Sequence, residues 1–83
     1  MQMWRLSVNS EQMIEMLKLL SERFIITCFT DRYDYIFTTR LYPTDRYINA
    51  NHKTFEGAFE IFITQILEHV GGKLKEEMLE IMK

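Results

Sequence analysis

Apolar and polar residues alternate through the middle of the chain in a pattern that predicts three antiparallel strands. Residues 24–30 and 35–42 are rich in β-branched and aromatic side chains, and the short segment 31–34 separates them. A second turn at 43–46 contains a proline and an aspartate and leads into a third strand over 47–53. We therefore expect a meander of three strands, with the rest of the chain covering it.

The two turns predict one consistent register for these strands. Pairing Thr30 with Tyr35, and Tyr42 with Tyr47, gathers the apolar side chains of all three strands on one face. That face is expected to carry Phe24, Ile26, Cys28, Phe37, Thr39, Leu41, Ile48, Ala50 and His52, with Leu41 opposite Ile48. The other face is expected to carry Ile25, Thr27, Phe29, Ile36, Thr38, Arg40, Tyr42, Tyr47, Asn49 and Asn51.

Helical periodicity precedes and follows the meander. Asn9 and Gln12 form a predicted capping box at the start of a first helix, which is expected to end near Glu22. Thr54 is the predicted N-cap of a second helix with a wide apolar stripe, and the pair Gly71 and Gly72 marks its end. Gly57 weakens this helix by about 1 kcal/mol relative to alanine, so close packing is the expected reason for it.

A further strand is predicted at the start of the chain, where Trp4, Leu6 and Val8 alternate with polar residues. The expected fold is a two-layer α+β domain in the order strand-helix-strand-strand-strand-helix, with a four-stranded mixed sheet and two helices on one face. The first helix makes a crossover, so the first strand should run parallel to the second and fourth. Two sheet orders, 1-2-3-4 and 2-3-4-1, stay open. The domain is expected to cover residues 1–72.

Residues 73–83 predict a short amphipathic helix of their own. Its apolar stripe is formed by Leu74, Met78 and Ile81, and a helix of this length is marginal in isolation. The stripe must therefore fold back onto the domain or be buried by another chain. Because two helices suffice to cover the sheet, we expect self-association through Leu74, Met78 and Ile81, as a twofold homodimer. Folding back is the alternative.

Composition and charge favour a small cytoplasmic protein. The chain has 83 residues, enough for one domain, and a single cysteine, which excludes an internal disulfide and fits a reducing compartment. No apolar run is long enough to predict a membrane span. The net charge of −2 divides into +2 for residues 23–53 and −4 for the rest, since all nine glutamates lie outside that segment. Glutamate favours helices and aspartate favours turns, which accounts for this division.

The sequence offers no convincing catalytic, cofactor or metal site. Cys28 and His52 share the predicted apolar face but lie two strand spacings apart, roughly 9.6 Å, whereas a thiol and its base need about 3 Å. His52 and His69 lack the spacing of zinc ligands, and one cysteine cannot complete a structural site. The tetrapeptide Thr-Asp-Arg-Tyr occurs at 30–33 and 44–47, in turns at opposite ends of the central strand. We expect turn chemistry there rather than a repeated binding element.

The polar face of the sheet is the candidate for binding a partner. Its contact-capable side chains are Phe29, Arg40, Tyr42, Tyr47, Asn49 and Asn51. Aromatic residues and arginine are typical of protein interfaces, so we expect a non-enzymatic protein that binds another protein as an inhibitor or adaptor. The alternative is a single-stranded nucleic-acid-binding module, since the same residues stack on bases and contact phosphates. The pI of 5.6 disfavours it. A solvated face with tyrosine and threonine chosen for β-propensity is equally compatible.

Two resemblances bear on this choice. The order helix, three strands, helix resembles that of double-stranded-RNA-binding domains, which place a lysine cluster at the start of their last helix. The corresponding segment here, KTFEGAFEIF, has Glu56 and Glu60 instead, so that function is not expected. In size and acidity the chain also resembles small phage-encoded inhibitor proteins. That resemblance implies a protein target.

Overall fold

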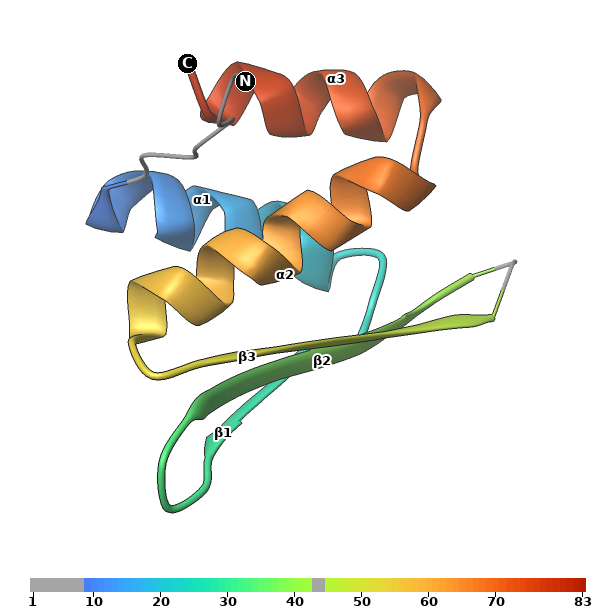
Figure 1. Cartoon of the computed structure of the whole chain (residues 1–83). Helices are drawn as coiled ribbons and strands as arrows, with labels where there is room; N and C mark the ends of the chain where they lie inside the picture. Colours follow the sequence, from blue (N-terminus) through green and yellow to red (C-terminus); the bar gives the residue numbers. More distant parts are fainter. Residues whose placement is uncertain (1–8, 43–44) are drawn as a thin grey trace, which may run out of the picture.

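Three antiparallel strands and three helices make up the protein in a computed structural model that describes residues 9–42 and 45–83. The elements in chain order are α1 (Ser10–Ser21), β1 (Thr27–Thr30), β2 (Tyr35–Leu41), β3 (Arg46–His52), α2 (Phe55–His69) and α3 (Gly72–Ile81). The sheet has the order β1-β2-β3, and all three helices lie on one side of it (Figure 1). The α+β class and the central meander are confirmed.

The predicted four-stranded mixed sheet is wrong. The sheet contains three strands, both pairings are antiparallel, and no other described segment pairs with β1 or β3. The strand predicted from Trp4, Leu6 and Val8 lies outside the described residues. Its prediction depended on one short run of alternation, and such a run does not specify a pairing partner. The parallel pairing and the two open sheet orders are corrected with it.

The register is confirmed for one pair of strands and wrong by two residues for the other. Thr30 pairs with Tyr35 as predicted, but Leu41 lies opposite Arg46 rather than Ile48. Asp45 adopts a left-handed backbone conformation with φ of 58°, which aspartate tolerates, so β3 begins directly after it. Side chains alternate between faces with a period of two, and a shift of two residues therefore leaves both predicted faces intact.

The predicted caps of α1 and α2 are confirmed. Asn9 Oδ1 accepts a hydrogen bond from the Gln12 N–H at 2.8 Å, and Gln12 Oε1 accepts one from the Asn9 N–H at 2.9 Å. Thr54 Oγ1 accepts a hydrogen bond from the Gly57 N–H at 3.0 Å. Each bond satisfies a backbone donor that a helix start would otherwise leave without a partner. Local residues thus set where these helices begin.

The core is built around α2, which lies directly over β2 and β3 (Figure 1). The Phe37 ring of β2 packs against three α2 rings, with centroid distances of 5.3 Å to Phe55, 5.6 Å to Phe59 and 5.3 Å to Phe62. In contrast, α1 packs mainly against α3 rather than on the sheet. As predicted, α1 lies on the same side of the sheet as α2, and its Met16 and Leu20 belong to the same buried cluster as Leu41 of β2. This arrangement leaves β1 poorly covered.

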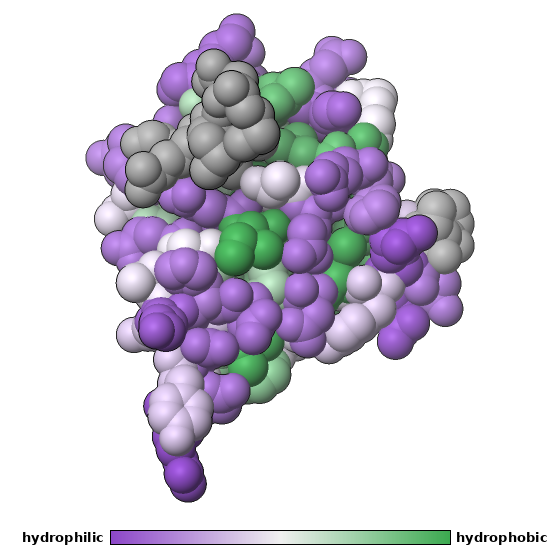
Figure 2. Space-filling model, viewed as in Figure 1, coloured by the Kyte–Doolittle hydropathy of each residue, from purple (hydrophilic) through white to green (hydrophobic). Residues whose placement is uncertain are grey.

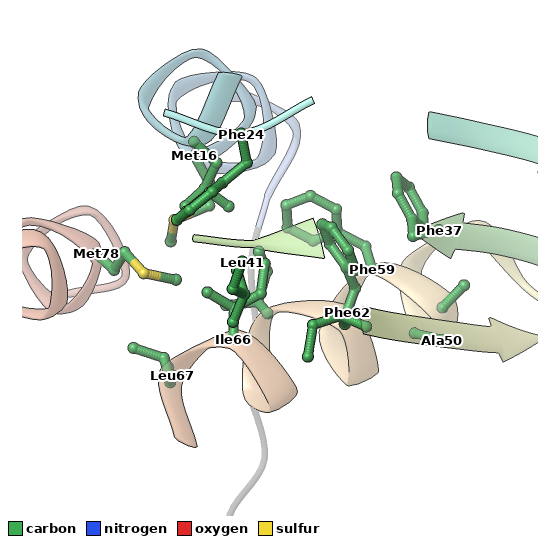
Figure 3. Packing of buried hydrophobic residues seen from close by; sticks show 14 of the residues in the cluster. Met16, Phe24, Phe37, Leu41, Ala50, Phe59, Phe62, Ile66, Leu67 and Met78 are labelled. Atoms are coloured by element: carbon green, nitrogen blue, oxygen red, sulfur yellow. The ribbon is translucent and has the colours of Figure 1, made fainter. Parts of the chain in front are cut away.

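The third helix folds back onto the other two. Met78 is fully buried, and Figure 3 shows it in the same cluster as Met16 of α1 and Ile66 of α2. The Gln12 side-chain amide donates a hydrogen bond to the Ile81 carbonyl at 3.0 Å and joins the start of α1 to the end of α3. Two of the predicted self-association residues are therefore buried within the chain: Leu74 and Met78. A homodimer through this stripe stays a prediction, and it would require α3 to move.

Candidate functional site

The sheet face turned away from the helices carries most of the residues nominated from the sequence. We call it the open face and define it by the side chains that share it. The strand register places them in three rows: Phe29, Ile36 and Asn51; then Thr27, Thr38 and Asn49; then Arg40 and Tyr47. Phe29 and Tyr47 are 47% and 55% exposed, so aromatic surface is available at both edges of this face.

Arg40 is held in place on the open face from two sides. Its Nη1 donates to Asp45 Oδ1 at 3.2 Å, and its guanidinium carbon lies 5.7 Å from the centroid of the Tyr47 ring. Both members of the ion pair are exposed, so the pair contributes little to stability. Its effect is to orient the guanidinium beside an exposed aromatic ring and to offset part of its charge.

The opposite end of the open face is also fixed by an aspartate. Asn51 Nδ2 donates to Asp34 Oδ2 at 3.2 Å. In the same turn Asp31 Oδ1 accepts the N–H groups of Tyr33 and Asp34, each at 2.8 Å. The N–H donors of Asp34 and Tyr33 hold the pKa of the Asp31 carboxyl below its ordinary value. The turn chemistry predicted at 30–33 is confirmed, and this turn projects from the body with a hydrophilic tip (Figures 1 and 2).

Tyr42 does not join the other five nominated residues. It follows the last residue of β2 and lines a separate cavity of about 370 Å³ together with Arg23 and His69. Its lining also includes the apolar residues Phe24, Leu41 and Leu74. The open face therefore brings together five of the six predicted partner-binding residues: Phe29, Arg40, Tyr47, Asn49 and Asn51.

A second cavity of about 370 Å³ was not expected from the sequence. It lies on the helical side of β1, and we call it the β1 groove; its lining is Leu17, Lys18, Ser21, Ile26, Cys28, Phe37 and Phe55. The sequence predicts Ile26, Cys28 and Phe37 on the apolar face of the sheet, where helices were expected to cover them. In the structure Cys28 is exposed, as are the other three residues of β1. One feature of the sequence could have indicated an exposed edge strand here: residues 27–30 include no charged side chain of the kind that usually prevents an edge strand from pairing with another chain.

The cysteine and histidine considered for nucleophilic catalysis are not brought together. Cys28 lies in the same cross-strand row as Phe37, whereas His52 lies two residues further along, opposite Tyr35. The Nδ1 atom of His52 accepts the N–H of Thr54 at 3.1 Å. Partial burial raises the pKa of the Cys28 thiol, which disfavours the reactive thiolate.

Among the described residues there is neither a metal-binding cluster nor a membrane-spanning helix. Residues 9–42 and 45–83 contain no group of three or more His, Cys, Asp or Glu side chains arranged to hold a metal ion. None of the helices in the described part of the chain is long and apolar enough to cross a membrane.

Comparison with known proteins identifies no relative. No protein-family model, curated protein or solved structure matches the chain. The chain has the element order helix, three strands, helix that was compared above with double-stranded-RNA-binding domains, followed by α3. In place of the lysine cluster of those domains, the first turn of α2 carries Glu56, and only Lys53 precedes its cap.

Proposed function

We propose that the protein is a non-enzymatic interaction module, of the inhibitor or adaptor type, that binds another protein through the open face. The observation that carries this proposal is the position of Arg40, held between Asp45 and the Tyr47 ring on a surface that none of the described helices covers. An arginine already oriented by its neighbours loses less conformational freedom on binding than a mobile one. Arginine and tyrosine are also the residues that most often dominate interface energetics.

Protein is favoured over nucleic acid by the charges around the open face. Asp45 offsets the charge of Arg40 at one end, and Asp34 lies beside Asn51 at the other. A phosphate backbone approaching this face meets a carboxylate at each end, which opposes the electrostatic term that drives nucleic-acid affinity. A protein partner can supply hydrogen-bond donors to the same carboxylates. We also propose a cytoplasmic location, since the single thiol suits a reducing compartment.

The first step of the test is a co-purification in which the full chain is the bait and the protein bound to it is identified. Affinity is then measured for Arg40→Ala and Tyr47→Ala, whose side chains are exposed and leave the core intact. Each is expected to weaken binding by about 2 kcal/mol, roughly thirtyfold. Glu68→Ala, an exposed change on α2, is the matched control and should leave affinity unchanged. The proposal is contradicted if only nucleic acid co-purifies, or if the partner binds both open-face variants with the affinity of the parent protein.

A second candidate function is binding of single-stranded nucleic acid. It is favoured by the exposed Phe29 and Tyr47 rings beside Arg40, since such rings stack on bases. Fluorescence anisotropy with labelled poly(U) checks it. This function requires that the affinity fall as salt is added and fall again in Tyr47→Ala. Binding that is independent of salt, or that survives the substitution, excludes the open face as a nucleic-acid site.

A further inference from the structure

β1 is an edge strand with backbone groups that have no partner in the described part of the chain. The Asp31 N–H donates to the Asp34 carbonyl at 3.1 Å, and Phe29 is paired with Ile36. In an antiparallel ladder, alternate residues direct both backbone groups toward the neighbouring strand. The backbone N–H and C=O groups of Phe29 therefore point toward β2. Those of Cys28 and Thr30 point away from β2, toward the outer edge of the sheet. The strand Thr27–Thr30 contains no proline and no charged residue, either of which would disfavour pairing with another strand.

The β1 groove runs beside the same edge on the helical side of the sheet. Cys28 contributes to its wall, and the aromatic rings of Phe37 and Phe55 contribute apolar surface. On the other side of the sheet, Phe29 is exposed, and Ile25, just before β1, is 84% exposed. A strand added along β1 would thus find apolar surface for its side chains on both faces.

We propose that β1 binds an extended segment of another protein, which pairs with its outer edge and inserts alternate side chains into the β1 groove. The inserted side chains are large and apolar, because the groove is lined mainly by Leu17, Ile26, Phe37 and Phe55. Lys18 lies at the groove and favours an acidic residue next to the inserted ones. Backbone hydrogen bonds supply affinity in this mode, and the groove supplies specificity.

A second copy of this chain does not fit the groove. If β1 paired with β1 of another copy, with the helical sides of both sheets facing the same way, the side chain placed beside the groove would be Cys28 or a threonine of that copy. Both side chains are too small to fill a cavity of about 370 Å³. A foreign segment with bulky alternate side chains is the better match.

This binding site shares Phe29 with the open face but lies along the outer edge of β1, and it does not depend on the function proposed for the open face. The probe is a displayed library of random linear peptides of about twelve residues, selected against the purified full chain. Enriched peptides are expected to carry large apolar residues at every second position, with an acidic residue nearby. The affinities of the enriched peptides are measured with the Thr30→Pro variant of the protein, which lacks one outward N–H group, and with the control variant Thr30→Ala. Cys28→Glu and Cys28→Ala form the matched pair for the groove.

Thr30→Pro and Cys28→Glu should each weaken peptide binding about tenfold or more, while both alanine controls bind as the parent does. N-methylation of the peptide provides a test that leaves the protein unchanged. It should abolish binding only at alternate positions, because only one set of peptide N–H groups faces β1. The proposal is overturned if no peptide is enriched, if methylation acts without alternation, or if Arg40→Ala rather than the β1 variants removes binding. Self-association lost in Cys28→Glu would replace the foreign segment with a second copy.

Discussion

The imidazole of His52 lies directly over the Cα atom of Gly57, where a Cβ atom would overlap the ring. His52 is the last residue of β3 and Gly57 lies in the first turn of α2. The ring is also tied to the cap of that helix, because its Nδ1 accepts the Thr54 N–H and lies 3.1 Å from Thr54 Oγ1. This contact explains a glycine at a position where helix propensity alone favours alanine.

We expect Gly57→Ala to lower the free energy of unfolding by about 1 kcal/mol, since an overpacking cost of about 1–3 kcal/mol exceeds the gain in helix propensity. The Cγ atom of His52 is among the overlapping atoms, so the whole side chain must move and lose its bond to Thr54. In a His52→Ala background the same change should be neutral or stabilising by up to about 1 kcal/mol. Chemical denaturation of the four proteins measures this coupling. Equal effects in both backgrounds contradict the contact.

Gln12 has two structural roles that substitution can separate. Its Oε1 completes the cap of α1, and its amide nitrogen donates to the Ile81 carbonyl. Gln12→Glu keeps the acceptor but loses the donor, and is expected to reduce stability by about 1 kcal/mol. Amide hydrogen exchange should then accelerate at the end of α3 while α1 stays protected. Asn9→Ala, which weakens the cap by about 1 kcal/mol, should act mainly on α1. Unchanged exchange in α3 after Gln12→Glu argues against the tether.

The placement of α3 predicts a large difference between two neighbouring substitutions. Met78 is fully buried, so Met78→Ala should cost about 2–5 kcal/mol of stability. Leu79 is exposed, and Leu79→Ala should change stability by less than about 0.5 kcal/mol. Thermal unfolding together with light scattering measures stability and mass in each protein. If Met78→Ala instead turned a dimer into an equally stable monomer, the stripe on α3 would be an intermolecular contact.

The β1–β2 turn should respond to acid through Asp31. Backbone N–H donors from Asp34 and Tyr33 stabilise the ionised carboxylate, so its folded pKa lies below the unfolded one. The associated stability is present above the unfolded pKa and is lost as pH falls through the folded pKa. Carbon-detected NMR titration should show Asp31 titrating below its ordinary value, with the Tyr33 and Asp34 amide signals shifting in parallel. In Asp31→Asn those amide shifts should no longer follow this titration. An unperturbed Asp31 titration refutes the turn geometry.

Several features were predictable because neighbouring residues determine them. The caps at Asn9 and Thr54 involve partners three residues away, which sequence spacing reveals. The two faces of the sheet follow from alternation alone, and this explains why they survived a register error of two residues. Five of the six predicted partner-binding residues share the open face for the same reason. The position of Tyr42 was missed because the strand ends at Leu41, before the alternation does.

The sequence by itself determined the caps of α1 and α2, the meander and the division of its side chains between two faces, because contacts between near neighbours and a period of two specify them. Only the tertiary structure decided the β2–β3 register, which depends on the left-handed conformation of Asp45. It also decided that α3 folds back onto α1, through contacts such as the hydrogen bond from the Gln12 side chain to the Ile81 carbonyl. Packing between distant segments, which no local pattern encodes, therefore produced the exposed edge and the groove beside it.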